Sequence, residues 1–122
     1  MNLTHPRIVV LTVTYGARWK YLSQMLDVID NDEYVSKIII VDNGSTNKED
    51  IRSGVAHYTK DIIILDQEKN LGSAGGYAAG IAYVKQLDCD YVFILDDDNV
   101  PEEGSVGVFL QRLREFDRDV VL

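Results

Sequence analysis

Four short runs of apolar, mostly β-branched residues constrain this sequence most, because a stretch with helical spacing follows each of them. The runs occupy residues 8–13, 37–41, 61–65 and 91–95. Strands that alternate with helices in this way form βαβ units, whose right-handed crossovers build a parallel sheet with helices on both faces. We therefore predict an α/β fold with a Rossmann-like sheet in the strand order 3-2-1-4, as in the first half of a doubly wound fold.

The helical stretches have readable boundaries and faces. The first spans residues 18–29 and the second residues 46–58, where Thr46 and Glu49 have the spacing of a capping box. A glycine-rich segment, residues 71–76, leads into the third helix. On the apolar side of that third helix the spacing predicts Tyr77, Ile81, Val84 and Leu87.

Composition and charge exclude several classes of protein. The 122 residues suffice for one domain, and no run approaches the roughly 18 apolar residues of a membrane span. The net charge of −8 argues against a nucleic-acid partner, which requires a basic face. Cys89 is the only cysteine, so no internal disulfide can form, and no secretory signal is visible at the N-terminus. We therefore expect a cytoplasmic protein.

The C-terminal residues resemble the start of another strand. Val120, Val121 and Leu122 are apolar, and no polar or flexible tail follows them. We expect residues 1–122 to form a single domain that is truncated at its C-terminal end.

Three consecutive carboxylates, residues 96–98, directly follow the apolar run 91–95 and are called the acidic turn. In an open α/β sheet, side chains at the carboxyl ends of the strands face the ligand crevice. Adjacent negative charges repel one another unless a cation lies among them, and Mg²⁺ or Mn²⁺ prefers carboxylate oxygens together with phosphate oxygens. The turn is therefore a candidate metal site. The alternative is a solvated acidic turn, and this segment alone does not separate the two.

The glycine-rich segment stands at a helix N-terminus, where bare backbone N–H groups favour phosphate or hydroxyl oxygens. It is neither a Walker loop nor a Gly-x-Gly-x-x-Gly fingerprint directly after the first strand. Taken alone, the segment is better explained by close packing of the helix on the sheet.

Other polar residues allow two interpretations each. Asp42 follows the second strand and could accept hydrogen bonds from a base or a ribose, or form an Asx turn. Tyr15 could stack on a base or close the edge of the sheet. Arg18 could pair with phosphate, although a solvated arginine is commoner there. His57 and Cys89 lack the neighbours of a metal or nucleophilic site, so we assign them structural roles.

Considered together, four motifs in chain order resemble the inverting family 2 glycosyltransferases, which have a GT-A fold. The resemblance covers nearly the whole chain, and the set is far more specific than any single motif. The motifs are Thr14-Tyr15 at the end of the first strand, Asp42-Asn43-Gly44-Ser45-Thr46, Asn70-Leu71-Gly72-Ser73-Ala74-Gly75-Gly76, and Asp96-Asp97-Asp98.

The resemblance implies that this chain is a nucleotide-sugar-binding domain. Residues after the first two strands would hold the nucleotide base, and the glycine-rich segment would approach the sugar or ribose. Asp96 and Asp98 would form the DxD motif that holds a divalent metal, Mn²⁺ or Mg²⁺, and the diphosphate, with Asp97 as the reserve candidate. The residues expected to bind the donor are Thr14, Tyr15, Asp42, Asn70, Gly72, Gly75, Gly76, Asp96 and Asp97.

The resemblance also implies an activity. A sugar would pass from a UDP- or dTDP-sugar donor to a glycan or lipid-linked acceptor during synthesis of bacterial cell-surface polysaccharides. The motifs are most similar to those of rhamnosyl- and galactofuranosyl-transferases, although Gly16 stands where many relatives have Asn. In such enzymes the general base lies further along the chain, here beyond residue 122, so this chain alone is expected to lack turnover. A homodimer, and association of the full-length enzyme with the inner face of the membrane, are left open.

Two alternatives remain at this stage. A sugar-phosphate nucleotidyltransferase would also need a metal and a glycine-rich loop, but it usually carries that loop just after the first strand, where this chain has Tyr15-Gly16-Ala17-Arg18. A non-catalytic fragment could bind nucleotide or metal, or associate with itself through an apolar edge.

Overall fold

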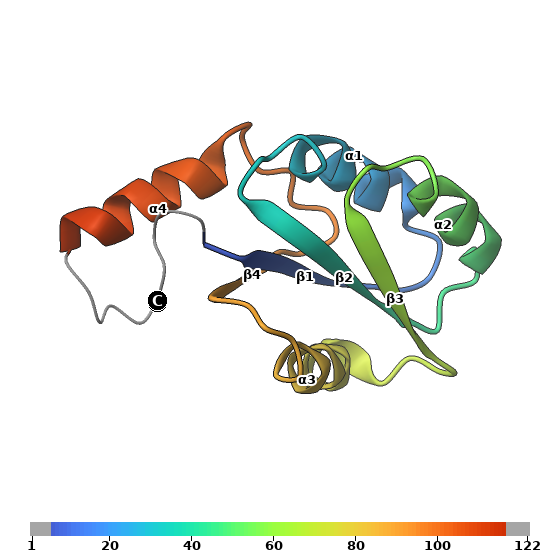
Figure 1. The fold of residues 1–122 in the computed structure, drawn as a ribbon. Coiled ribbons are helices and arrows are strands. Elements are labelled where there is room, and N and C mark those ends of the chain that lie inside the picture. Colours follow the sequence, from blue (N-terminus) through green and yellow to red (C-terminus); the bar gives the residue numbers. More distant parts are fainter. Residues whose placement is uncertain (1–5, 117–122) are drawn as a thin grey trace.

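A parallel sheet of four strands forms the centre of the computed structural model, which describes residues 6–116 (Figure 1). The strands lie in the order β3-β2-β1-β4, which confirms the predicted order. The strands are β1 (Ile8–Thr14), β2 (Val35–Asn43), β3 (Asp61–Gln67) and β4 (Tyr91–Ile94). The helices are α1 (Trp19–Ile29), α2 (Lys48–Val55), α3 (Gly72–Val84) and α4 (Ser105–Phe116).

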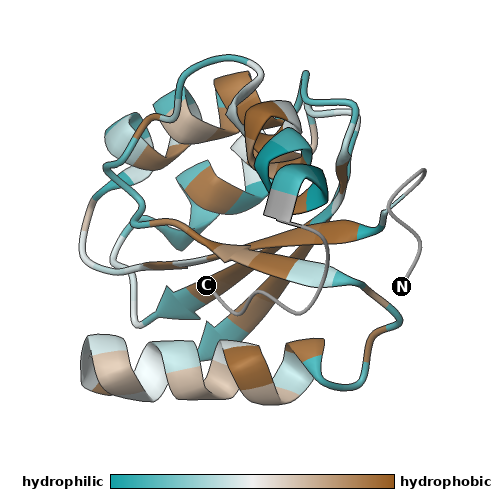
Figure 2. Ribbon diagram, turned by 90° about the vertical axis from the view of Figure 1, so that its left-hand side faces the viewer, coloured by the Kyte–Doolittle hydropathy of each residue, from teal (hydrophilic) through white to brown (hydrophobic). Residues whose placement is uncertain are grey.

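Helices cover both faces of the sheet, as the alternation of strands and helices predicts (Figure 1). Successive residues of β1 point to opposite faces: Ile8 and Val10 pack with α1, α2 and α4, whereas Val9 and Leu11 pack on the α3 side. Figure 2 shows the resulting layers, with hydrophobic strands between α3 and the other helices. Every residue of β1 is buried, so this strand is the middle of the core.

Of the residues predicted on the apolar side of α3, Val84 is buried as expected, but Gly76 and Gly80 make up the rest of the buried stripe. Ile81 is 39% exposed, while Tyr77 and Leu87 pack only at the margin of the core. A Cβ added at Gly80 would lie 2.5 Å from Leu11 Cδ1, so glycine lets the helix backbone approach β1 closely. The pattern of apolar side chains misses this stripe because glycine has none. The buried residues of α3 are Gly76, Gly80 and Val84.

The strand β4 has one open face, whereas the sequence predicts cover on both. Val92 and Ile94 are 37% and 52% exposed. Through their pairing with β1 they face the α3 side, but α3 lies over β1 and β2. The strand also ends one residue before the predicted Leu95, whose N–H still donates to Leu11 O at 3.0 Å.

The helix α2 begins without the predicted capping box at Thr46. Its N-cap is Asn47, and no side chain caps it. The Thr46 N–H instead donates to Gly16 O at 2.9 Å, which ties this turn to the loop after β1. Near the end of α2, a Cβ added at Gly54 would lie 1.9 Å from the Trp19 ring, so only glycine fits against α1 here. The helix is therefore shorter at both ends than the sequence predicts.

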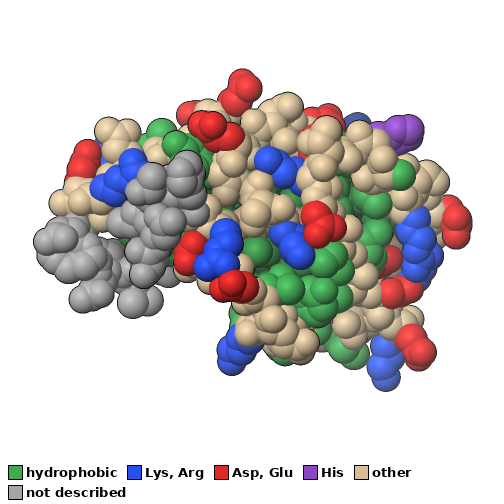
Figure 3. All heavy atoms as spheres, viewed as in Figure 1, with side chains coloured by type: hydrophobic (Ala, Val, Ile, Leu, Met, Phe, Trp, Pro, Cys, Tyr) green, Lys and Arg blue, Asp and Glu red, His purple; other side chains and the backbone are tan. Residues whose placement is uncertain are grey.

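Residues 120–122, the predicted start of a further strand, lie outside the described residues. Within residues 6–116, no helix is both long and apolar enough to cross a membrane. On the face seen in Figure 3, acidic and basic side chains are interspersed rather than segregated.

Candidate functional site

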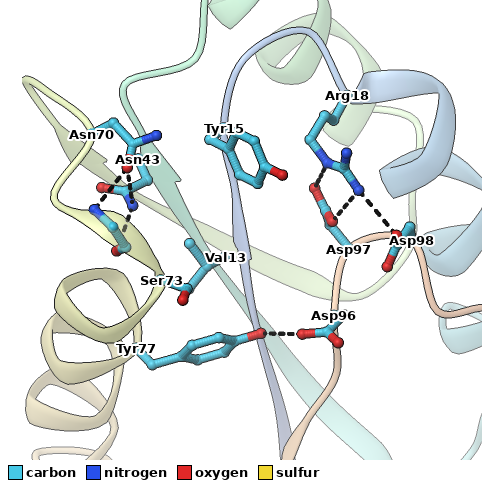
Figure 4. Close-up of a pocket in the computed structure, with 11 residues that line it drawn as sticks. Val13, Tyr15, Arg18, Asn43, Asn70, Ser73, Tyr77, Asp96, Asp97 and Asp98 are labelled. Carbon is cyan, nitrogen blue, oxygen red and sulfur yellow. Dashed lines mark hydrogen bonds and ion pairs between the residues drawn. The ribbon is translucent and has the colours of Figure 1, made fainter.

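A pocket of about 390 Å³ opens at the carboxyl ends of β1, β2 and β4, beside the N-terminus of α3 (Figure 4). This is the crevice in which a parallel sheet of this kind binds its ligands. The predicted site residues that line it are Tyr15, Asn70, Gly72, Asp96, Asp97 and Asp98. The remaining lining residues are Val13, Arg18, Asn43, Ser73 and Tyr77.

Asp97 is the buried member of the acidic turn, with 4% of its surface exposed. The Arg18 guanidinium donates to both of its carboxylate oxygens, from Nε to Oδ2 at 2.7 Å and from Nη2 to Oδ1 at 3.0 Å. The Thr14 hydroxyl donates to Oδ2 at 2.9 Å. Hydrogen bonding to Asp97 raises the pKa of Arg18 above its ordinary value, so the arginine stays charged. Both oxygens of Asp97 are therefore occupied by the protein itself.

Asp96 and Asp98 flank this buried carboxylate and are exposed. Asp96 accepts a hydrogen bond from the Tyr77 hydroxyl at 3.1 Å, which fixes it against α3. Burial, followed by the hydrogen bond to Asp96, raises the pKa of Tyr77 to about 12, so the phenol keeps its proton at neutral pH. Asp98 lies 3.2 Å from Arg18 Nη2, and 57% of its side chain is exposed. The two outer carboxylates therefore keep oxygens free for a ligand.

Tyr15 stands between the two sides of the pocket (Figure 4). Its ring is 45% exposed, and the Arg18 guanidinium lies 4.9 Å from the ring centroid. The ring centroid of a second tyrosine, Tyr21, lies 5.2 Å from the same guanidinium. Both distances are within the range of cation–π attraction. Tyr15 is therefore an accessible aromatic surface with an arginine against it, rather than a buried plug.

Asn43 organises the opposite side of the pocket. It is buried at the end of β2, and its Nδ2 donates to Asn70 Oδ1 at 3.0 Å and to Gly72 O at 2.9 Å. Its Oδ1 accepts the Leu71 N–H at 2.9 Å. Gly72 has a φ of 77°, a left-handed conformation that glycine adopts without strain. One side chain thus sets the course of the backbone into α3.

Four predicted donor-binding residues do not line the pocket: Thr14, Asp42, Gly75 and Gly76. Thr14 is fully buried behind Asp97. Asp42 is also buried, and its Oδ1 accepts the Ser45 N–H at 2.9 Å, which is the Asx-turn interpretation. A Cβ on Gly76 would lie 2.7 Å from Val13 Cγ1, so this glycine serves close packing.

Sequence reasoning assigned no site role to Asn43 or Tyr77. Helical spacing predicts Tyr77 on an apolar face, yet its hydroxyl reaches the acidic turn, 19 residues further along the chain. Asn43 lies inside one of the four motifs, which predict a binding role for its neighbour Asp42 instead. The local sequence favours a solvated Arg18, whereas the structure pairs it with Asp97. Only the contacts between distant segments identify these three residues.

Asp96 and Asp98 have the right donor chemistry for Mg²⁺ or Mn²⁺. In residues 6–116, no group of three or more His, Cys, Asp or Glu side chains converges as a complete metal cage. Such a cage is not required, because these ions commonly take one or two protein carboxylates together with substrate phosphate oxygens. The exposed carboxylates fit a metal that is bound together with a phosphorylated ligand.

An open parallel sheet with acidic side chains and a helix N-terminus at its carboxyl edge defines the Rossmann-like class of ligand-binding α/β proteins. Within that class, residues 9–122 match the model of glycosyl transferase family 2, and the chain belongs to this family. The match spans all four motifs at the rim of the pocket.

Relatives support the same placement. The chain is 31% identical to galactofuranosyltransferase GlfT1 of Mycolicibacterium smegmatis over 105 residues, which are 85% of this chain and 34% of that protein. Among solved structures, it resembles the mannosyltransferase PcManGT of Pyrobaculum calidifontis in complex with GDP-Man and Mn²⁺, with a TM-score of 0.75, 20% identity, and coverage of 89% of this chain and 32% of that one. The chain thus spans about a third of the length of these relatives.

The fold alone does not distinguish a glycosyltransferase from the nucleotidyltransferase alternative. The 4-diphosphocytidyl-2C-methyl-D-erythritol synthase of Anaerococcus prevotii matches with a TM-score of 0.68 at 17% identity, over 96% of this chain and 53% of that one. The family match and the galactofuranosyltransferase similarity place the chain with the family 2 glycosyltransferases, and the nucleotidyltransferase alternative is not favoured.

Proposed function

We propose that this chain supplies the donor-binding part of an inverting glycosyltransferase that uses a UDP- or dTDP-sugar and a divalent metal, Mn²⁺ or Mg²⁺. The observation that carries the proposal is the pair of exposed carboxylates, Asp96 and Asp98, facing a pocket that also contains Tyr15 and the N-terminus of α3. An aromatic ring, backbone N–H groups and carboxylates match the base, the phosphates and the metal of such a donor.

Asp96 and Asp98 would hold the metal together with the donor diphosphate. When bound, the metal would offset the negative charge that develops on the departing diphosphate. The acceptor hydroxyl oxygen would bond to the anomeric carbon on the face opposite the diphosphate, whose bond to that carbon breaks, so the configuration inverts. The hydroxyl proton would pass to a general base, which we expect beyond residue 122.

The other side of the pocket suits the nucleoside and the sugar. Tyr15 offers a flat exposed surface for the base. Asn70 and Gly72 border the pocket where a ribose or sugar hydroxyl would need hydrogen-bonding partners. Asp42, which is buried in its own turn, would support the base site through that turn rather than by direct contact.

The acceptor side is proposed on similarity alone. Because the chain is similar to a galactofuranosyltransferase, a glycan or lipid-linked acceptor in bacterial cell-surface polysaccharide synthesis is the most consistent choice. Synthesis of that kind would place the full-length enzyme in the cytoplasm, at the inner face of the membrane. Assembly as a homodimer stays a prediction.

Isothermal titration of the chain with UDP, dTDP and GDP, each with and without Mn²⁺, tests the donor site. We expect binding of UDP or dTDP that depends on Mn²⁺, and loss of that binding in Asp96→Ala and Asp98→Ala. Both variants should stay folded, because each removes repulsion among neighbouring carboxylates. Asp61→Ala is the matched control, since Asp61 is an exposed acid at the opposite end of β3.

Three results would count against the proposal. Metal-independent binding, or no binding of any nucleotide, would mean that the chain does not carry a metal-assisted donor site. An Asp98→Ala variant that binds nucleotide and Mn²⁺ as the parent does would refute the assignment of the metal ligands.

A further inference from the structure

The acidic turn has three consecutive carboxylates, and the middle one differs from the other two in its burial. Asp97 is 4% exposed, while Asp96 and Asp98 on either side are exposed. A buried carboxylate is costly unless it is paired and hydrogen-bonded. The partners of Asp97 therefore decide how the turn is held.

Asp97 has its partners entirely within the protein. Arg18 approaches it side-on with two parallel N–H bonds of 2.7 and 3.0 Å, and the Thr14 hydroxyl adds a third bond of 2.9 Å. This forked geometry is the strong and directional form of an arginine–carboxylate pair. For Asp97 to bind a metal, these bonds would have to break. Asp97 is thus an anchor rather than a ligand.

Arg18 is itself held in place. Its guanidinium lies 4.9 and 5.2 Å from the ring centroids of Tyr15 and Tyr21, and its side chain is 22% exposed. The same Nη2 that bonds to Asp97 lies 3.2 Å from an oxygen of Asp98. The arginine therefore fixes the direction of both the second and the third carboxylate.

The contact joins segments that are distant in sequence. Thr14 and Arg18 belong to the end of β1 and the loop that follows it, while Asp97 follows β4, 83 and 79 residues away. We propose that Arg18 is a positioning residue: by clasping Asp97 it fixes the acidic turn so that Asp96 and Asp98 present their free oxygens to the metal and diphosphate of the donor. This inference rests on the proposed function and assigns the middle aspartate a purely structural part.

The charge of Arg18 and its positioning role predict opposite changes in Mn²⁺ affinity when the side chain is removed. The inference can therefore be tested. A guanidinium next to carboxylates repels a metal cation, so its removal should strengthen Mn²⁺ binding if charge alone matters. If Arg18 instead positions the turn, its removal should weaken Mn²⁺ binding. Loss of an outer contact that orients metal ligands typically costs about 10- to 100-fold in metal affinity.

The experiment measures Mn²⁺ binding to the chain in the presence of saturating UDP, by electron paramagnetic resonance of the free ion. We expect Arg18→Gln to weaken Mn²⁺ binding by about tenfold or more. Arg18→Lys should also bind weakly, because an ammonium keeps the charge but cannot form the forked pair. Arg112→Gln, which removes the same charge from an exposed site on α4, should bind Mn²⁺ as the parent does.

The failure of this inference is distinct from failure of the proposed function. If the parent chain binds no Mn²⁺ with nucleotide, the proposed function fails first. If the parent binds and Arg18→Gln binds equally well or more tightly, the positioning inference is wrong. If Arg18→Lys binds Mn²⁺ as the parent does, any cation next to Asp97 suffices and the forked pair is not needed, and the inference is again wrong.

A second variant covers the case in which Arg18→Gln does not fold, as judged by circular dichroism. Thr14→Val preserves the buried shape but removes the hydroxyl bond to Asp97, and Thr14 is fully buried and cannot touch the ligand. We expect a several-fold loss of Mn²⁺ affinity that Thr14→Ser largely restores. Unchanged affinity in Thr14→Val would contradict the inference independently of Arg18.

Discussion

The side chain of Asn43 carries the sharpest quantitative prediction, because this one buried amide makes three hydrogen bonds to residues 70–72. Its Nδ2 donates to Asn70 Oδ1 and Gly72 O, and its Oδ1 accepts from the Leu71 N–H, at distances of 2.9 to 3.0 Å. Asn43→Ala removes all three bonds and leaves the backbone groups of residues 71 and 72 without these partners.

The size of the effect follows from these bonds. Each hydrogen bond contributes about 0.5–1.5 kcal/mol net, so we expect Asn43→Ala to lower the free energy of unfolding by about 2–4 kcal/mol. For a domain of this size, that corresponds to a fall in melting temperature of about 10–20 °C. Nucleotide binding should weaken too, because Asn70 and Gly72 lose the contact that sets their positions.

Urea denaturation monitored by circular dichroism gives the free energy of unfolding. Asn31→Ala is the matched control, since the Asn31 amide makes a single exposed hydrogen bond to Asp27 O. That variant should change stability by no more than about 0.5 kcal/mol, as exposed substitutions usually do. A loss below about 1 kcal/mol in Asn43→Ala would refute the view that this amide organises the pocket.

Three further predictions concern other contacts. Tyr77→Phe should weaken Mn²⁺-dependent UDP binding by about tenfold, because it removes the hydrogen bond that orients the metal-ligand candidate Asp96; since the pKa of Tyr77 is raised to about 12, parental binding should show no phenol titration between pH 7 and 10. Gly76→Val should cost at least about 2 kcal/mol in urea denaturation, because its Cβ would lie 2.7 Å from Val13 Cγ1; unchanged stability would show that the helix can move away. Burial raises the pKa of Asp30, but hydrogen bonds from the N–H groups of residues 59–60 lower it below 3.8 overall. Its stabilisation is therefore complete above pH 3.8 and lost as pH falls through the folded-state pKa, so Asp30→Asn should flatten the acid limb of the stability–pH curve.

The order of strands could be predicted from sequence because it depends on patterns within each segment. Four β-branched runs separated by helical stretches leave few topologies open once crossovers are right-handed. The position of the pocket followed, since parallel strands bring Tyr15, Asn70 and the acidic turn to one edge. These features need only periodicity and chain direction.

The features that sequence reasoning missed all depend on contacts between distant segments. The glycine stripe of α3 is determined by the approach of Gly80 to Leu11 on another element. The open face of β4 depends on where α3 lies across the sheet, which no local pattern encodes. The hydroxyl of Tyr77 and the guanidinium of Arg18 find carboxylates only after the sheet has formed.

The pocket consists of two layers, and the distinction explains why the motif residues behave unequally. Thr14, Asn43 and Asp97 are buried and bond to other parts of the protein, whereas Tyr15 and Asp98 are accessible. Neighbours in sequence thus divide between the layers at Thr14-Tyr15 and at Asp97-Asp98. The motif Thr14-Tyr15 predicts the same role for both residues, whereas only Tyr15 lines the pocket. In this structure the inner residues fix the loops, and only the outer ones remain free to meet a ligand.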